Sequence, residues 1–189
     1  MKKIMVVAFA IWGFSATAEA ALDYGVELGV RQQSGEVAGV NFSANSQTAF
    51  QGGVFAHVPL DEKNQAHWRV GLLYTQRPLE SESDITGEAI EYKINYLDIP
   101  FDLLFKPKEN LGFYFGFNIA INIDSTCKGN SNCKVLDVTS PYFPLVFGVI
   151  YKFTPKWGMD FYLEGANGMV AKGLGDYRAV GLNLTFSVE

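Results

Sequence analysis

The chain has two histidines, His57 and His67, and these are the first residues to consider for catalysis. A hydrolase or acyltransferase site would combine a histidine base with a serine nucleophile and a carboxylate. Neither histidine has a serine two residues away, and both flank a short polar stretch, 61–65, that is typical of a turn. We therefore interpret them as solvated polar side chains at strand ends and predict no catalytic residue.

The two cysteines, Cys127 and Cys133, enclose the five residues Lys-Gly-Asn-Ser-Asn. In an exported protein this spacing favours a disulfide over free thiols, and two thiolates are too few for a structural metal site. Closing so small a ring stabilises the loop by about 2 kcal/mol at most. We predict a disulfide that shapes one loop, and no metal or cofactor site.

Asp98 and Asp102 are two carboxylates four residues apart in a segment of alternating apolar residues. On a strand they would share one face but lie about 13 Å apart, too far for a paired general acid and base. Ion pairs with Arg69, Lys106 or other cations are the favoured interpretation. The glycines of 173–175 have neither a Walker lysine nor a following helix, which argues against a phosphate-binding loop.

The N-terminal residues indicate export. Lys2 and Lys3 precede an uncharged, mostly apolar stretch from Ile4 to Ser15, and Ala18-Glu19-Ala20 provides the small residues of a cleavage site. We predict a signal peptide at 1–20 and one mature domain at 21–189. Cleavage removes two of the 15 basic and one of the 20 acidic residues, leaving 13 and 19, so a nucleic-acid role is disfavoured.

The mature region alternates apolar and polar residues, which is typical of β-strands. From Leu111 to Asp124, the odd positions carry Leu, Phe and Ile without interruption, and this run exceeds the usual globular strand. Nineteen Gly, fifteen Phe and nine Tyr also favour strands. The eight predicted strands are 22–31, 47–58, 67–77, 87–105, 111–124, 142–153, 158–166 and 179–188. No later segment is long enough for a membrane helix.

Within 87–105 the apolar positions change parity near Asn95. Three apolar residues, Ile90, Tyr92 and Ile94, are even-numbered. The apolar series that follows is odd-numbered: Leu97, Ile99, Phe101, Leu103 and Phe105. An inserted residue would restore the register, and Pro100 removes a ladder donor nearby. We therefore predict a β-bulge between Asn95 and Pro100.

The connections alternate between short and long, as in outer-membrane barrels. Short turns are expected at 61–65, 106–110 and 154–156, and long loops at 32–46, 78–86, 124–138 and 168–177. With both termini in the periplasm, the long loops face outward. Interfacial aromatics at the periplasmic end are then Tyr24, Trp68, Phe105, Phe113, Phe153, Trp157 and Phe186. Those expected at the outer level are Tyr74, Tyr92, Tyr142, Phe143 and Tyr177.

Alternation alone fits a soluble barrel as well as a membrane barrel, because a soluble barrel turns its apolar face inward. Here the apolar faces are too bulky for a narrow eight-stranded interior, whereas the polar faces contain many Gly and Ala residues. Charges facing lipid cost about 2–4 kcal/mol each, so they belong in the lumen. The predicted lumen charge network is Glu27, Arg31, Arg69, Asp98, Asp102 and Glu164.

The sequence Tyr96-Leu97-Asp98-Ile99-Pro100-Phe101, followed by Leu103, Leu104 and Lys106, resembles a strand of the porin-family outer-membrane β-barrel proteins. This group includes PorT-like and OmpX-like small barrels. Gly112-Phe113-Tyr114-Phe115-Gly116 is similar to that family's next strand. The resemblance implies an eight-stranded barrel without shared catalytic residues. One departure is the C-terminus, Phe186-Ser187-Val188-Glu189, which lacks the terminal aromatic that assembly machinery recognises.

We therefore predict an all-β, eight-stranded antiparallel up-and-down transmembrane barrel in a Gram-negative outer membrane. It would be monomeric and non-enzymatic, with a salt-bridged lumen and loops for structural or surface-interaction roles. Its expected partners are outer-membrane lipid, the barrel-assembly machinery and an extracellular molecule at the long loops. Two alternatives stay open: an outer-membrane lipid-modifying enzyme, and a soluble exported barrel that binds a small apolar ligand. A wide pore is disfavoured because an eight-stranded interior is filled by side chains.

Overall fold

The computed structural model describes residues 22–38, 42–83, 85, 87–129 and 133–188. The predicted signal peptide, 1–20, lies outside these residues, so the domain division and the cleavage site stay predictions. No helix among the described residues is long and apolar enough to cross a membrane.

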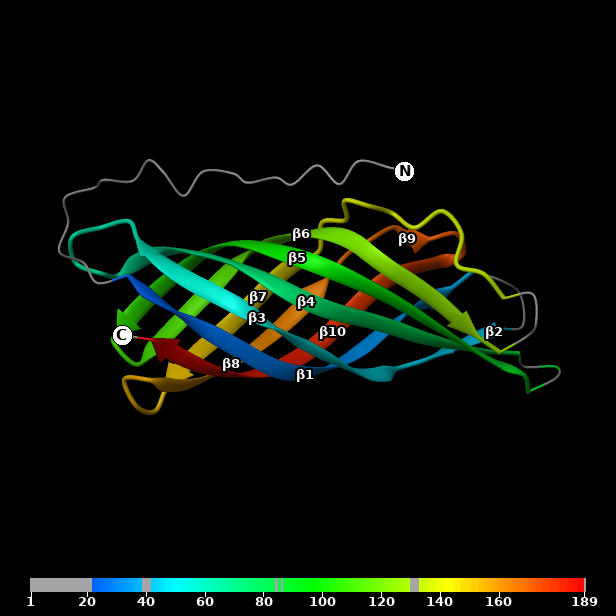
Figure 1. Ribbon diagram of the computed structural model, residues 1–189, viewed down its shortest axis with the longest axis horizontal. Helices are drawn as coiled ribbons and strands as arrows, with labels where there is room; N and C mark the ends of the chain where they lie inside the picture. Colours follow the sequence, from blue (N-terminus) through cyan, green and yellow to red (C-terminus); the bar gives the residue numbers. More distant parts are fainter. Residues whose placement is uncertain (1–21, 39–41, 84, 86, 130–132, 189) are drawn as a thin grey trace, which may run out of the picture.

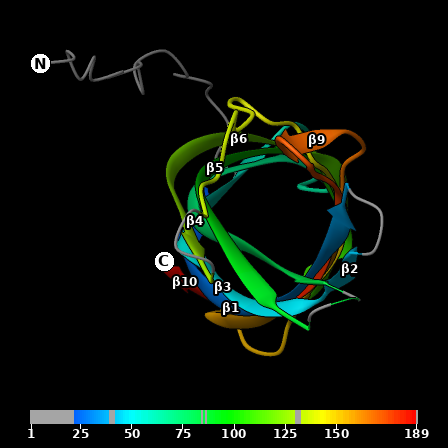
Figure 2. The same cartoon turned by 90° about the vertical axis from the view of Figure 1, so that its right-hand side faces the viewer.

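Eight long strands form a closed ring (Figures 1 and 2). They are β1 Asp23–Val37, β3 Gln47–Pro59, β4 Ala66–Ser83, β5 Ala89–Lys108, β6 Leu111–Lys128, β7 Leu145–Lys152, β8 Trp157–Gly165 and β10 Leu174–Val188. Two short strands, β2 Phe42–Asn45 and β9 Met169–Ala171, pair with β4 and β10.

The ring closes between the first and last strands. β1 pairs antiparallel with β10 from Tyr24↔Val188 to Val37↔Leu174, and every other neighbouring pair is also antiparallel. All eight predicted strands are present, so the predicted up-and-down barrel is confirmed.

The apolar face of each strand lies on the outside of the ring. Leu28 is 69% exposed, whereas its neighbour Glu27 is 3% exposed. Exposed Phe, Leu, Ile and Val side chains continue around β3, β6, β7, β8 and β10. The charged and small residues face the lumen, which is the reverse of the arrangement in a soluble barrel.

The two ends of the barrel differ. At one end, which we call the turn end, β3–β4, β5–β6 and β7–β8 are joined by short turns beside the C-terminal end of β10 (Figure 1). In the first turn, Asp61 Oδ1 accepts hydrogen bonds from the backbone N–H groups of Gln65 and Ala66, both at 2.9 Å. These bonds hold the pKa of Asp61 below its usual value. The opposite end, which we call the loop end, carries β2, β9 and the longer connections.

The predicted loop at 78–86 is wrong for most of its length. β4 continues to Ser83 and pairs with β5 as far as Glu82↔Ala89. Pro78 lies in a gap on the edge of β4 that faces β3 and β2: pairing with β3 ends at Thr75, and pairing with β2 begins at Glu80. A proline is tolerated there because no strand on that edge requires its missing N–H donor.

A register irregularity does occur within the predicted interval, between Asn95 and Tyr96, but its origin is different. Asn95 pairs with Asp124 and Tyr96 pairs with Asn122, so the inserted residue is Ile123 of β6. The side chains of β5 keep the same inward and outward parity on both sides of this irregularity. Ile94, Tyr96 and Asp98 are all fully buried on the lumen side.

The change of parity marks instead the level at which the strands leave the apolar band. There the outward face becomes polar, at positions that we call the polar belt: Gln32, Thr48, Gln76, Asn95, Asp124 and Arg178. The Thr48 hydroxyl donates to Gln32 at 2.9 Å, and the Asn95 amide donates to Asp124 at 3.3 Å.

Beyond the polar belt the interior of the barrel is apolar. A buried cluster, here called the outer core, contains Leu79, Ile94, Tyr96, Ala120, Tyr142, Val170, Ala171, Leu174 and Tyr177. The prediction that Tyr142 and Tyr177 lie at the lipid interface is therefore wrong, because both pack inside this cluster, and Tyr92 packs against it. Tyr74 and Phe143 do face outward and are exposed.

Candidate functional site

The lower half of the lumen, nearer the turn end, is organised around one guanidinium. Arg69 bonds Asp102 at 2.9 Å, Glu27 at 3.0 Å and Asp160 at 3.1 Å. Tyr114 donates its hydroxyl to Asp160 at 2.9 Å, and its ring centroid lies 4.6 Å from the guanidinium carbon of Arg69. A single arginine thus serves three buried carboxylates.

The upper half holds a second network with balanced charge. Arg77 binds both oxygens of Asp98, at 3.0 and 2.8 Å, and also contacts Glu164 at 3.0 Å. Arg31 of β1 also contacts Glu164 of β8, at 2.7 Å. The two residues lie on opposite sides of the β1–β10 pairing that closes the ring. Bidentate arginine–carboxylate pairs of this kind fix geometry as well as charge.

The aromatic side chains complete the filling of the lumen. Tyr162 donates its hydroxyl to Gln51 at 2.9 Å, and the Tyr96 ring lies 5.0 Å from the Arg77 guanidinium carbon. Tyr114 and Tyr162 cover Gly148 and Gly181, where an added Cβ would collide with the tyrosine ring. These close contacts explain why glycine occupies one inward position on β7 and one on β10.

The histidines lie at the turn end, as expected, but the prediction that they are solvated is wrong, because His57 is 2% and His67 is 3% exposed. His57 Nδ1 is 2.9 Å from Asp23, and the same carboxylate pairs with Lys106 at 3.2 Å and Lys152 at 2.8 Å. His67 is buried nearby, and no hydrogen bond links either ring to a serine within the described residues. The described ranges also contain no cluster of three or more His, Cys, Asp or Glu residues that could hold a metal ion.

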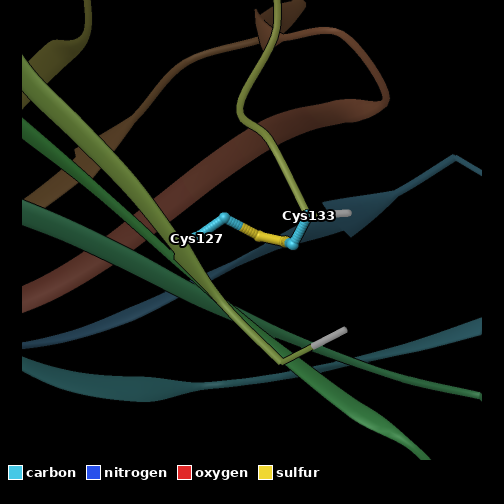
Figure 3. The surroundings of a disulfide bond; sticks show 2 residues. All are labelled: Cys127 and Cys133. Carbon is cyan, nitrogen blue, oxygen red and sulfur yellow. A yellow bond between two sulfur atoms is a disulfide. The ribbon is translucent and has the colours of Figure 1, made fainter. Parts of the chain in front are cut away.

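At the loop end the outer core lies above the charge networks. Tyr96 donates its hydroxyl to the carbonyl of Thr139 at 3.2 Å, and Thr139 in turn bonds β9 through Val170 at 2.8 Å. Residues 133–144, which follow β6, are therefore folded against the barrel rim and β9. Cys127 at the end of β6 and Cys133 form a disulfide that joins this segment to the strand (Figure 3).

The structure places all six predicted network residues, Glu27, Arg31, Arg69, Asp98, Asp102 and Glu164, in the lumen and buried. It divides them between two clusters and adds Arg77 and Asp160, which the prediction omitted. Both omitted residues have the parity of the neighbouring inward charges, Arg69 and Glu164, so alternation along β4 and β8 could have identified them. Lys106 does not bind Asp98 or Asp102 but pairs with Asp23.

The predicted aromatics of the turn end lie on the outward faces of their strands. Tyr24, Phe105, Phe113, Phe153 and Trp157 are exposed. Trp68 stacks on Phe101 with ring centroids 4.6 Å apart, and Trp157 packs against Phe186 at 4.8 Å. This level is the one at which amphipathic rings meet a membrane surface.

A closed antiparallel ring with apolar side chains outside and ion pairs inside defines a small transmembrane β-barrel. The outer membrane protein beta-barrel domain family matches residues 14–166. The chain therefore belongs to this family of outer-membrane barrels, and its location is the bacterial outer membrane.

One solved structure supports the fold assignment, and two others are similar with lower TM-scores. Ail, the attachment invasion locus protein of Yersinia pestis, in complex with the heparin analogue sucrose octasulfate, has a TM-score of 0.52 and 12% sequence identity, covering 88% of this chain and 99% of that chain. Neisserial surface protein A has a TM-score of 0.47 and 13% identity over 89% of this chain and 98% of its own. OprG of Pseudomonas aeruginosa has a TM-score of 0.42 and 12% identity over 88% and 91%. No curated protein matches the sequence significantly.

Proposed function

We propose that the protein is a non-enzymatic outer-membrane barrel with a closed lumen, and that its loop end serves structural or surface-interaction roles. The observation that carries the proposal is that side chains fill the lumen at successive levels along the barrel axis. Two buried ion networks around Arg69 and Arg77 occupy the middle, and the outer core lies above them. An eight-stranded barrel filled in this way has no room for a wide aqueous channel.

Conductance across planar bilayers tests the closed lumen. The wild-type barrel should give no steady channel steps. The double variant Tyr142→Ala and Tyr177→Ala removes two buried rings from the outer core and should raise the leak. Tyr151→Ala, which changes an outward-facing tyrosine of β7, is the matched control and should behave as wild type. Steady wild-type conductance would overturn the proposal.

The absence of catalysis is supported by the surroundings of the histidines. His57 is held by Asp23, and both residues belong to a cluster with two lysines at the turn end. We expect cells that overproduce the protein to show unchanged outer-membrane lipids by mass spectrometry. If a modified lipid accumulates and is lost in His57→Gln or His67→Gln, the lipid-modifying enzyme is the correct function.

The charge of the β4–β5 hairpin at the loop end favours a basic partner. Residues 78–94 carry five carboxylates, at 80, 82, 84, 88 and 91, against one lysine, Lys93. In the described part, Asn45 donates to both Glu80 and Glu82 at 3.2 Å, which holds these two carboxylates together. Because this hairpin is acidic, we expect it to bind a polycation and not a polyanion such as the sucrose octasulfate bound to Ail.

Binding of a fluorescent oligolysine to barrels in lipid nanodiscs tests this selection. Wild type should bind oligolysine in preference to a sulfated oligosaccharide, and the variant Glu80→Gln with Glu82→Gln should bind it more weakly. The control, Glu62→Gln with Glu109→Gln, removes two charges from the turn end and should bind as wild type. Preference for the sulfated ligand would refute the assignment.

A further inference from the structure

A groove of about 1050 Å³ crosses the outward face of the barrel at the level of the polar belt. One of its lining residues is Gly165, the last residue of β8, which follows the outward-facing Leu163 in the alternating pattern. An added Cβ at Gly165 would meet no heavy atom within 4 Å, so the position is open space. Leu145 on β7 and Arg178 on β10 are its direct cross-strand neighbours.

The walls of the groove are apolar on the side that faces the lipid. Phe143 and Phe147 line one side, and Leu163 and Val180 line the other. All four side chains are exposed, with 46–54% of their surface accessible. Polar residues, Gln32, Ser34 and Asn167, line the groove toward the loop end. The groove therefore has the polarity of a lipid molecule, apolar along its length and polar at one end.

Arg178 stands at that polar end. It faces outward on β10 and is exposed, whereas the three arginines of the lumen are buried in ion pairs. No carboxylate within the described ranges forms a salt bridge with it. Within the described residues its hydrogen bonds use only the backbone carbonyl, which accepts from Gln33 and Ser34. Its guanidinium is thus available to an external anion at the membrane boundary.

We propose that this groove binds one phosphate-bearing, anionic lipid of the outer leaflet, with an acyl chain along Leu163 and Val180 and its phosphate on Arg178. Guanidinium groups recognise phosphate by paired, charge-assisted hydrogen bonds. The groove volume is comparable to that of established small-molecule sites. The position decides between occupants, because the apolar walls face the bilayer, where lipid is the neighbouring molecule.

Native mass spectrometry of the barrel in detergent tests the proposal. Phosphatidylglycerol and phosphatidylcholine with identical acyl chains are supplied in equal amounts. Wild type should retain phosphatidylglycerol in preference to phosphatidylcholine. Arg178→Gln should reduce phosphatidylglycerol retention about tenfold and abolish the preference, because a hydrogen-bonded charge is lost. Gly165→Leu fills the groove without a backbone clash and should lower retention of both lipids.

Two control variants separate the site from general charge and bulk. Lys93→Gln removes an outward-facing cation that is already paired with Glu91. Leu72→Phe adds volume to the lipid-facing surface of β4, away from the groove. Both controls should keep the wild-type preference, and a heat-dependent shift in gel mobility confirms that each variant is folded.

Equal retention of the two lipids by wild type would overturn the proposal, as would an Arg178→Gln variant with unchanged preference. A dimer that Gly165→Leu dissociates would show instead that a second copy of the chain occupies the groove.

Discussion

Removal of the Arg69 guanidinium should destabilise the barrel more than any other single charge deletion. Arg69 is the only cation within salt-bridge distance of Glu27, Asp102 and Asp160 in the described structure. Arg69→Leu would leave three buried carboxylates without a counterion. Breaking a single buried pair costs about 3–5 kcal/mol, so we expect a loss of at least about 3 kcal/mol in the free energy of unfolding.

The assay is reversible urea unfolding in lipid vesicles, followed by tryptophan fluorescence and by gel mobility. Lys93→Gln is the matched control, because its pair with Glu91 at 2.9 Å has side chains 44% and 32% exposed. Loss of such an exposed pair should cost less than about 1 kcal/mol.

A combined variant separates uncompensated charge from lost packing. Arg69→Leu together with Glu27→Gln, Asp102→Asn and Asp160→Asn removes all four charges, and most of the lost stability should return. Lowering the pH should also reduce the difference in the free energy of unfolding between Arg69→Leu and wild type, since protonated carboxyl groups carry no charge. If Arg69→Leu unfolds within about 1 kcal/mol of wild type, the charge argument is refuted.

Three further predictions concern the ends and the wall of the barrel. Cys127→Ser with Cys133→Ser should lower stability by about 2 kcal/mol at most and make the outer loop more sensitive to protease, as seen by limited proteolysis. Asp61 has a lowered pKa, so its contribution to the free energy of unfolding is present at neutral pH and is lost as the pH falls through the folded-state pKa. Asp61→Asn should therefore weaken acid sensitivity in unfolding titrations followed by fluorescence. Gly148→Val should collide with the tyrosine ring over it and cost about 1–3 kcal/mol in urea unfolding, whereas Gly165→Ala in open space should be neutral.

The strands and their faces could be predicted from the sequence because lipid and lumen impose opposite polarity on alternate residues. In β6, Phe113 and Phe115 face outward while Tyr114 faces the lumen, as the two-residue period requires. The bulk of the apolar face also identified it as the outer one, because Phe, Leu and Ile at nearly every position would not fit inside eight strands.

The upper strand segments could not be assigned in the same way, because the polarity of the two faces reverses beyond the polar belt. Leu79 and Ile94 are inward-facing and fully buried there, whereas Glu80 and Lys93 face water. The prediction assumed one polarity along the whole strand. It therefore interpreted the reversal near Asn95 as a bulge of β5 and the polar stretch at 78–86 as a loop.

The partners in the lumen depend on geometry that alternation does not contain. Glu164 meets Arg31 and Arg77 from strands far away in the chain, 133 and 87 residues distant. Which inward charges meet is determined by the stagger of the strands around the ring and by the tyrosines between them. Residue parity predicts only that such charges share the interior.

The reversal of polarity along β4 and β5 implies a fixed height for the loop end above the lipid. From Asn95 to Ala89, β5 rises six residues beyond the polar belt, which is about 15 Å along the barrel axis for a strand tilted by about 40°. The acidic tip of the β4–β5 hairpin, where Glu80, Glu82 and Glu88 lie, is therefore held above the polar belt by paired strands that enclose the outer core. A macromolecule that docks on this tip would be held clear of the lipid headgroups and would not need to dehydrate the membrane surface to bind.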